Sequence, residues 1–565
     1  MKRMLGTVAA LLCLSVALPA QAVRPREGAT VVHPSPVATP HKRTPALTPT
    51  APDALTRALA QGRIDPARYA LERWASVWHP RAVRARFGDV LPADPHALTM
   101  LARDLQVRVG NLRGHLLARA QRLLARPTDG KGDPEGDGYS VPEKPPFCDA
   151  HVCIHYVRRS PDKVPAGDHN GNSIPDYVES AGAVMANVWQ REVAQMGFRA
   201  PKSDLSSDND GGNAKLDVYL ADVGKRYYGY CQTDDPHLTQ GSNYRYGDGS
   251  AYCVLDNDYA GFGYPDPLDP LKVTAAHEFF HAVQFAYDYF EDDWLLEGTA
   301  SMMEDEVYDR IDDNLQYLGS SPLNDPSIPL DKDTDRVYGT WIFWRFLTEY
   351  FGSAKDHDIS VLRDIFAKVD WSPTGPDQYS AQALANVVNA RKIGGTRWHF
   401  SWAFADFGAW NASPKTYYEE GGKYRTSQVA KTAKITGSNP KVASVARLDH
   451  LTNRYVSILR GSGVRNTADL RVSIDGPASS ASPEATALVF KDGGGVALRV
   501  ISLDSNGNGS VTVGFGGDVR KVVVVTSNAS VRFTKCYKFL TPYSCWGGVP
   551  VDDGRSFAMT ATLIQ

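Results

Sequence analysis

The stretch 271–308 restricts the possible folds of this chain more than any other part of the sequence. It contains two successive helical patterns, 271–290 and 294–308, and a short acidic run separates them. His277 and His281 are four residues apart, so on a helix both imidazoles lie on one face and can reach a single ion. The sequence therefore predicts a metal-binding helix followed closely by a second helix.

Glu278 follows His277 directly, so its carboxylate can face a water molecule at an open coordination position of the ion. Two neutral nitrogens, a carboxylate base and a position for water are what a zinc hydrolase requires. A chance H-E-x-x-H match is expected in roughly a few per cent of chains this long. The interpretation therefore depends on a third ligand.

Glu297 is the candidate for that ligand, because it lies on the first turns of the second helix, 16 residues after His281. The three-histidine variant of the motif is excluded, since Gln284 and Tyr287 occupy the positions where it requires Gly and His. Two rivals, Glu304 and Asp293, lie nearby. Glu304 is about two helical turns beyond Glu297, roughly 10 Å along the axis, so both cannot bind one ion; we expect it to be solvated or to support a ligand from behind.

The segment WLLEGTAS at 294–301 resembles the W-L-x-E-G-x-A-[ST] segment that carries the zinc-binding Glu in gluzincin peptidases, including the M1-type aminopeptidases. HEFFHAVQFAYD, followed by EGTA, also resembles a family of secreted bacterial metalloproteases of that clan. The resemblance covers about 250–280 residues of the middle region. It implies a gluzincin-like α+β zinc peptidase domain in which Glu297 is the third zinc ligand.

The same resemblance implies a role for Tyr338, in RVYGTWIFWRFLTEYFG, as a donor to the oxyanion that forms when water attacks a carbonyl. A buried Tyr that caps the helix is the alternative, and His357 is a weaker candidate for the same role. No G-x-M-E-N-type segment, which binds a free amino terminus in M1 enzymes, is present, and this favours an endopeptidase. We also expect the run SAYCVLDNDY to be the strand that aligns an extended peptide.

These observations predict a secreted zinc-dependent metallopeptidase that acts on a protein or peptide substrate, with Glu278 as general base. The alternative is a non-catalytic secreted binding or adhesion protein whose metal sites are structural. Structural zinc usually has four protein ligands, whereas three ligands and a carboxylate beside the open position are typical of a catalytic site.

A second ion is predicted at 168–179, DHNGNSIPDYVE, where oxygen-bearing residues follow the rhythm of an EF-hand-like calcium loop. A polar turn that caps the following helix is the alternative. The loop departs from the pattern at position 6, where Ser173 replaces the usual Gly, and Pro175 is also unusual. The predicted Ca²⁺ ligands are Asp168, Asn170, Asn172, Ile174 through its carbonyl, Asp176 and Glu179.

The first residues have the layout of a secretory signal peptide (1–22), with Lys2 and Arg3 before an apolar run and small residues at the cleavage site. A Pro/Ala/Thr-rich spacer (23–52) follows, which cannot bury a core. We expect no membrane span once the signal is removed, since no later stretch offers about 20 apolar residues. Localisation is therefore predicted to be extracellular or periplasmic.

The region 53–146 is predicted to be a helical segment with a linker, and its position suits a pro-segment that covers an active site. Residues 53–126 carry 13 arginines and no lysine against six acidic residues. A nucleic-acid surface is possible on this count, but we expect arginines on solvated helix faces and no nucleic-acid partner. The whole chain is close to neutral, with 61 basic and 64 acidic side chains.

The middle region, 147–428, begins with strand-like runs and continues with helical patterns, which predicts an α+β domain. Beyond it, 429–565 contains short β-branched runs separated by Gly, Asn, Asp and Ser, which predicts an all-β sandwich of about seven or eight strands. The chain is thus multidomain. The sandwich could bind a surface or polysaccharide ligand, although its sequence does not identify one.

Six cysteines remain after the signal, an even number that favours disulfides in an oxidising compartment. Fifteen pairings are formally possible. Neighbours in sequence predict the pairs Cys148–Cys153, Cys231–Cys253 and Cys536–Cys545.

Overall fold

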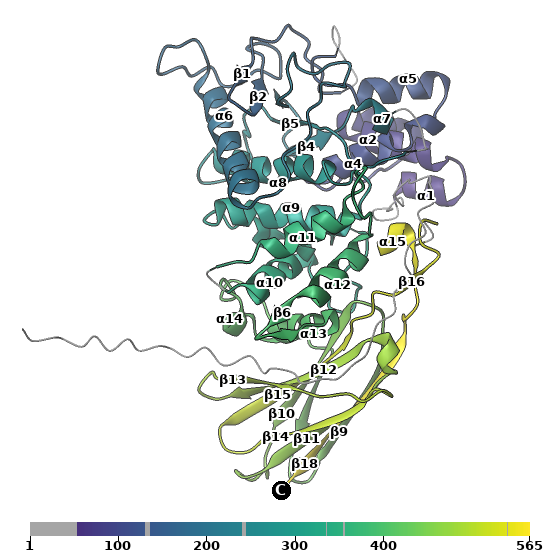
Figure 1. The fold of residues 1–565 in the computed structure, drawn as a ribbon, viewed down its shortest axis with the longest axis vertical. Helices are drawn as coiled ribbons and strands as arrows, with labels where there is room; N and C mark the ends of the chain where they lie inside the picture. Colours follow the sequence, from purple (N-terminus) through teal and green to yellow (C-terminus); the bar gives the residue numbers. More distant parts are fainter. Residues whose placement is uncertain (1–52, 130–135, 240–243, 335, 354–355, 539–540) are drawn as a thin grey trace, which may run out of the picture.

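The computed structural model describes residues 53–129, 136–239, 244–334, 336–353, 356–538 and 541–565. The predicted signal peptide and spacer lie outside the described residues. The chain is multidomain and mixes helices with several β-sheets: a helical and mixed α/β part is followed by two C-terminal sheets (Figure 1).

The N-terminal segment is helical, as the sequence predicts. Asp53 accepts a hydrogen bond from the Thr56 amide and caps α1, and Asp65 caps α2 in the same way through the Arg68 amide. The helices are α1 (Ala54–Ala60), α2 (Pro66–Trp78), α3 (Pro80–Phe87), α4 (Leu98–Gln106) and α5 (Gly114–Leu123).

A mixed five-stranded sheet follows, in the order β1-β2-β3-β5-β4. Its three central strands are parallel, and β1 and β4 run antiparallel at the two edges. The predicted strands at the start of the middle region are present as β2, β3 and β5, whereas β1 and β4 were not predicted. The strands are β1 (Phe147–Cys148), β2 (Val152–His155), β3 (Leu216–Ala221), β4 (Gly229–Gln232) and β5 (Tyr252–Asp256).

Helices cover both faces of this sheet, which explains why its inner strands are buried at every position. One face packs on α6 (Asp176–Trp189) and α8 (Asp269–Phe285). The other face, with Tyr219, Tyr230 and Tyr252, packs on the N-terminal helices around Trp74. The N-terminal segment is thus one layer of a three-layer arrangement, and its removal would expose an apolar sheet face to water.

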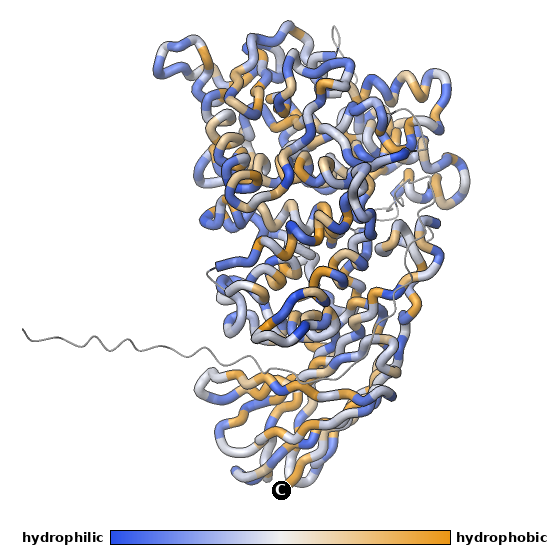
Figure 2. Tube along the Cα trace, viewed as in Figure 1, coloured by the Kyte–Doolittle hydropathy of each residue, from blue (hydrophilic) through white to orange (hydrophobic). Residues whose placement is uncertain are grey.

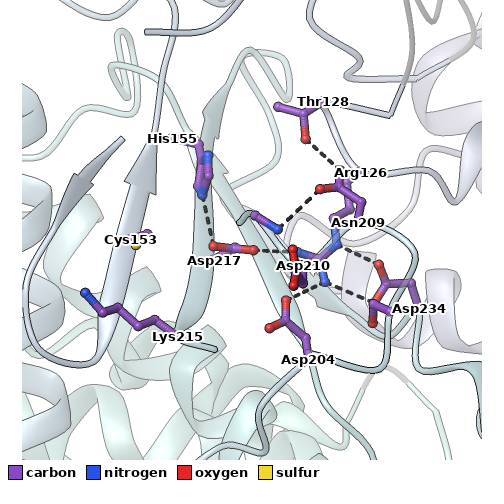
Figure 3. A network of polar contacts seen from close by, with 12 residues as sticks. Arg126, Thr128, Cys153, His155, Asp204, Asn209, Asp210, Lys215, Asp217 and Asp234 are labelled. Atoms are coloured by element: carbon purple, nitrogen blue, oxygen red, sulfur yellow. Dashed lines mark hydrogen bonds and ion pairs between the residues drawn. The ribbon is translucent and has the colours of Figure 1, made fainter. Parts of the chain in front are cut away.

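Arg126, just after α5, ties the N-terminal layer to the sheet (Figure 3). Its fully buried guanidinium contacts Asp217 at 2.6 Å, Asp204 at 2.7 Å and Asp234 at 2.6 Å. Asp217, on β3, also binds Nε2 of His155 on β2 at 2.9 Å. Such a buried network is strongly destabilised when one partner is removed.

The sequence had led us to expect the arginines of this layer on solvated helix faces. Several of them are instead buried. Arg73, Arg103, Arg108 and Arg126 are buried, with at most 3% of their surface exposed. They are neutralised by carboxylates, as in the pair between Arg73 and Asp53 at 2.8 Å. Arg108 pairs with Asp104 one helical turn away, whereas the partners of the other three lie 20 or more residues away, which is why a local charge count does not find them.

A helical layer follows the sheet. Figure 2 shows that hydrophobic residues recur along these central helices and along the C-terminal strands, whereas surface loops are mainly hydrophilic. The helix predicted at 271–290 corresponds to α8 (Asp269–Phe285), which begins two residues and ends five residues earlier. The helices are α9 (Asp293–Tyr308), α10 (Trp341–Phe351), α11 (Ser360–Val369), α12 (Ser380–Ala390), α13 (Phe400–Ala412) and α14 (Pro414–Tyr417), with a hairpin of β6 (Lys392–Ile393) and β7 (Thr396–Arg397) and the short α7 (Pro236–Thr239).

The C-terminal region contains a five-stranded sheet, β13-β12-β15-β10-β8, and a four-stranded sheet, β14-β11-β18-β9. Their facing side chains share one core, and the outer face of the larger sheet packs on α13. Among the described residues these two sheets have nine strands, where the sequence predicted about seven or eight. The strands are β8 (Lys431–Ile435), β9 (Lys441–Leu448), β10 (Thr452–Arg460), β11 (Asp469–Asp475), β12 (Pro483–Lys491), β13 (Val496–Val500), β14 (Asn508–Gly514), β15 (Val519–Asn528) and β18 (Arg555–Ile564).

A segment between β15 and β18 leaves the sandwich and runs back along the helical layer (Figure 1). It contains β16 (Phe533–Thr534), α15 (Ser544–Gly547) and β17 (Val549–Pro550). Ser544 anchors it, because its hydroxyl accepts a hydrogen bond from the Trp294 indole at 3.1 Å. The segment thereby reaches the start of α9.

The three predicted disulfides are confirmed: Cys148–Cys153, Cys231–Cys253 and Cys536–Cys545. Disulfides of this number are typical of proteins that fold in an oxidising, extracytoplasmic compartment. Among the described residues, no helix is long and apolar enough to span a membrane.

Candidate metal centre

The centre lies where α8 and α9 pack against each other beneath the sheet. Gly298 allows α9 to approach the start of α10 closely, because a Cβ at this position would clash with Thr340 Oγ1 and with the Trp344 indole. The packing of α9 therefore requires a small residue directly after Glu297. It lets α9 lie directly on the segment that begins α10.

Three ligand atoms converge between the two helices. Nε2 of His277 lies 3.1 Å from Nε2 of His281 and 3.2 Å from Oε2 of Glu297, and His281 Nε2 lies 3.5 Å from the same oxygen. All three side chains are at most 2% exposed. Two imidazole nitrogens and one carboxylate oxygen, gathered around one point, are the donor set of a catalytic zinc site.

The second nitrogen of each imidazole, Nδ1, has its own hydrogen-bond partner. His277 Nδ1 lies 2.7 Å from Oε1 of Glu304, and His281 Nδ1 lies 2.7 Å from Oε1 of Gln284. These contacts orient both rings so that Nε2 faces the shared point, which is how partners of metal-bound histidines act. Glu304 is buried, so it has the supporting position that was predicted as one of its two alternatives, and not the solvated one.

The charges of the centre also suit a cation. Burial alone would raise the pKa of Glu297, but the neighbouring His281 and His277 outweigh it and lower that pKa to about 2. Its second oxygen, Oε1, is buried and has no hydrogen-bond partner among the described residues. Burial raises the pKa of Glu304 to about 8, against the opposing effect of His277. The residues present therefore fit a bound zinc ion.

Glu278 contacts the N-terminal layer and not solvent. Its Oε2 accepts a hydrogen bond of 2.8 Å from the hydroxyl of Thr99 on α4, and that hydroxyl accepts one of 2.9 Å from the Cys231 amide on β4. Burial raises the pKa of Glu278, and its neighbours His281 and His277 oppose this. Thr99 has no signal in the sequence, because it lies 179 residues from Glu278 and belongs to no motif.

Aromatic rings cover the same side of the centre. His96 stacks on Tyr228, with ring centroids 4.4 Å apart, and lies 6.3 Å from the His277 ring and 6.1 Å from the Tyr338 ring. Burial lowers the pKa of His96 to about 3, and proximity to His277 adds to this, so the ring is neutral. Tyr317 stacks on Tyr338 at 5.5 Å. Apart from Tyr338, none of these rings had a sequence signal beyond its aromatic character.

Tyr338 lies within reach of the centre, whereas two weaker candidates do not. The Tyr338 ring is 6.4 Å from the His277 ring, and burial raises the pKa of its hydroxyl well above 10, so the hydroxyl keeps its proton. His357 instead contacts Glu306 at 2.9 Å, near the other end of α9. Asp293 pairs with Arg103 of α4 and takes no part in the triad.

The predicted calcium loop is partly assembled. Asp168 accepts hydrogen bonds from the amides of Asn172 at 3.1 Å and Ser173 at 3.0 Å. Ser173 has a φ of 70°, the left-handed conformation for which an EF-hand loop uses Gly. Glu179 accepts from the side-chain amides of Asn172 at 2.7 Å and Asn170 at 2.9 Å. An ion would bind Glu179 in place of these amides.

Two other predicted ligands of this loop are arranged differently. Asp176 turns toward His169 and accepts a hydrogen bond from its amide at 3.0 Å. The Ile174 amide donates to Asn172 Oδ1 at 2.8 Å, and this contact fixes the turn. The loop therefore brings four of the six predicted ligands together and sends Asp176 to a neighbouring histidine.

A second group of acidic oxygens lies close together at Asp305, Asp312 and Glu420. Lys423 contacts both Asp312 and Glu420 at 2.5 Å, and Arg345 pairs with Asp305. Basic side chains thus already neutralise this group.

Comparisons with known proteins do not place the chain in a family. No protein-family model and no curated protein matches the chain. Among solved structures, CorA, a surface-associated copper-binding protein important in copper acquisition by Methylomicrobium album BG8, is 8% identical with a TM-score of 0.16, covering 24% of this chain and all of its own. A family GH115 4-O-methyl-α-glucuronidase with specificity for decorated arabinogalactans is 9% identical with a TM-score of 0.13, covering 66% of this chain and 54% of its own.

Proposed function

We propose that this chain is a secreted zinc-dependent metallopeptidase of the gluzincin type that hydrolyses internal peptide bonds. The observation that carries the proposal is the convergence of His277 Nε2, His281 Nε2 and Glu297 Oε2 beside the carboxylate of Glu278. Three protein ligands leave a position for water, whereas a structural zinc site is usually closed by a fourth.

Zinc, when bound by these three residues, would supply Lewis acidity that activates water and polarises a carbonyl group. Glu278 would take the proton from the attacking water and pass it to the leaving amine. The protonated hydroxyl of Tyr338 would donate a hydrogen bond to the oxyanion. Glu304 and Gln284 would hold the two imidazoles in their orientation throughout.

The edge strand β4 is the element that can align an extended peptide. The run that becomes β5 was expected to do this, but β5 lies inside the sheet between β3 and β4. At the edge, the Cys231 amide donates to Thr99 and not to a neighbouring strand. A substrate carbonyl could accept that hydrogen bond by β-strand addition.

In this structure, Thr99 occupies two positions that a substrate would need. Its hydroxyl accepts a hydrogen bond from the Cys231 amide at the sheet edge and donates one to the Glu278 carboxylate. All of these groups are almost fully buried. We infer that the start of α4 must separate from β4 before a peptide can reach the centre. In this proposal the N-terminal layer covers the site and is also part of the core.

Metal analysis and hydrolysis assays on the purified chain test this function. We expect one zinc per chain, and hydrolysis of casein or a peptide library that 1,10-phenanthroline abolishes. The Glu278→Ala variant should keep its zinc and lose hydrolysis. A chain that binds zinc but shows no hydrolysis under any condition that opens the site would favour the alternative of a non-catalytic binding protein.

A further inference from the structure

Residues 93–99, which lead into α4, run alongside the edge of the sheet. Three contacts join them to the edge in the same order along both segments: the Ala93 carbonyl with the Arg226 guanidinium at 3.1 Å, the His96 ring with the Tyr228 ring at 4.4 Å, and the Thr99 hydroxyl with the Cys231 amide at 2.9 Å. The segment therefore accompanies the start of β4 and the strand itself past the metal centre.

The His96 side chain fills a pocket made of aromatic rings. Its ring is stacked on Tyr228, meets the Tyr317 ring edge-on at 5.2 Å, and lies 6.1 Å from the Tyr338 ring, between ring centroids. His96 is 8% exposed, and neither of its ring nitrogens forms a hydrogen bond with a residue that the structure describes. The pocket thus holds a flat ring through its face and edges, and not through polar contacts.

This pocket lies directly beside the metal centre. The His96 ring is 6.3 Å from the ring of His277, one of the three proposed ligands. Consecutive Cα atoms of a peptide are 3.8 Å apart, so a substrate whose carbonyl reached the centre would place in this pocket a side chain next to the cleaved bond. Tyr338, the proposed donor to the oxyanion, forms one wall of the pocket.

Tyr317 provides an independent sign that the pocket serves a ligand. Its hydroxyl is buried and has no hydrogen-bond partner among the described residues, which is unfavourable for a polar group away from water. Tyr228, by contrast, is only partly buried, so the stacked wall reaches the molecular surface. The pocket therefore combines an unused donor in one wall with a second wall that a ligand can approach from solvent.

We propose that this is the specificity pocket of the peptidase, that it accepts a flat aromatic side chain of the substrate, and that His96 replaces that side chain in the closed structure. The inference rests on the proposed function. When residues 93–99 leave β4, an aromatic ring of the substrate regains the stack on Tyr228 and the edge contact with Tyr317. A branched aliphatic side chain gains apolar contact but not this ring geometry.

The first experiment probes the pocket without any peptide. His96→Ala in the full zinc-loaded chain empties the pocket, and an empty apolar cavity binds small molecules such as benzene. Toluene, the side chain of phenylalanine, should raise the melting temperature of this variant by several degrees and leave that of the wild type unchanged. Methylcyclohexane, a ring of similar size without a flat face, should have a clearly smaller effect. No toluene shift, or equal shifts with both compounds, would overturn the proposal.

The second experiment measures hydrolysis by the same His96→Ala chain, with peptides that carry either Phe or Leu beside the cleaved bond. We expect kcat/KM to be about tenfold higher for Phe. Tyr228→Leu, added to this variant, should remove most of that preference because the stacked wall is lost. Tyr246→Leu is the matched control, since it alters a partly buried tyrosine that lies against Arg245, and it should retain the preference.

The outcomes separate this proposal from the proposed function. Hydrolysis without a preference for Phe would overturn the specificity pocket alone. An equal loss of preference in the Tyr228 and Tyr246 variants would do the same, because the stacked wall would then not be its cause. No hydrolysis of any peptide would overturn the proposed function and, with it, the assignment of this pocket to a substrate.

Discussion

The hydroxyl of Thr99 lies 2.8 Å from Oε2 of Glu278, although 179 residues separate them in the chain. The same hydroxyl accepts the Cys231 amide at 2.9 Å, so one side chain of the N-terminal layer joins the proposed general base to the edge of the sheet. The proposed active site is therefore closed by a hydrogen-bonded contact.

Replacing Thr99 by Ala should increase peptidase activity. The variant leaves the Cys231 amide and Glu278 without a partner only while the site is closed, so it destabilises the closed arrangement by about 1–3 kcal/mol. We expect kcat/KM to rise by about tenfold, with zinc content unchanged. Thr99→Ser retains both hydrogen bonds and should behave as the wild type. A fall in kcat for Thr99→Ala, rescued by Ser, would instead mean that Thr99 positions the base.

Glu297→Gln should remove zinc from the centre, because an amide oxygen is a much weaker ligand than a carboxylate. Metal analysis after dialysis should give less than a tenth of the wild-type zinc. Glu304→Gln changes only the partner of His277 Nδ1, so zinc affinity should fall by about 10–100-fold without loss of the site. Asp293→Asn should retain zinc. Full zinc occupancy in Glu297→Gln would contradict the proposed ligand set.

Arg126→Ala should destabilise the protein strongly, because it leaves Asp204, Asp217 and Asp234 buried without their shared countercharge. The expected loss is about 3–5 kcal/mol in the free energy of unfolding. Chemical denaturation followed by tryptophan fluorescence measures it. The exposed Arg122, one turn earlier, is the control, and its replacement by Ala should change stability by less than about 1 kcal/mol. Similar small effects for both variants would show that the network is not an anchor.

Stability should fall between neutral and alkaline pH because of His155. Burial by itself would lower the pKa of this imidazole, but its hydrogen bonds with Asp217 and Glu143 outweigh burial and raise the pKa to about 9. The folded-state pKa lies above the unfolded value of 6.5, so the contribution is complete below pH 6.5 and is lost as the pH rises through 9. The loss should reach about 3 kcal/mol at most.

The melting temperature of the wild type and of His155→Gln, measured from pH 6 to pH 10, checks this prediction. The variant should be less stable at pH 6 and should show a flatter decline above it. His115→Gln, which alters an exposed histidine, should follow the wild-type curve. Parallel curves for wild type and His155→Gln would exclude the proposed origin of the decline.

Local patterns were sufficient for much of this protein. The four-residue spacing of His277 and His281 predicted a helix with both rings on one face, and α8 has that form, because side chains one helical turn apart are neighbours in any helix. The three disulfides joined cysteines that are close in sequence, and the alternating β-branched runs after 429 became strands. These features depend on short-range geometry, which the order of residues encodes directly.

The tertiary structure alone decided which distant groups meet. Thr99 and His96 lie over the centre because the N-terminal helices pack across the edge of the sheet, and β4, not β5, forms that edge because of strand order. Arg126 is buried because three carboxylates from separate segments surround it. Such contacts arise from packing between elements, and no local periodicity or spacing specifies them.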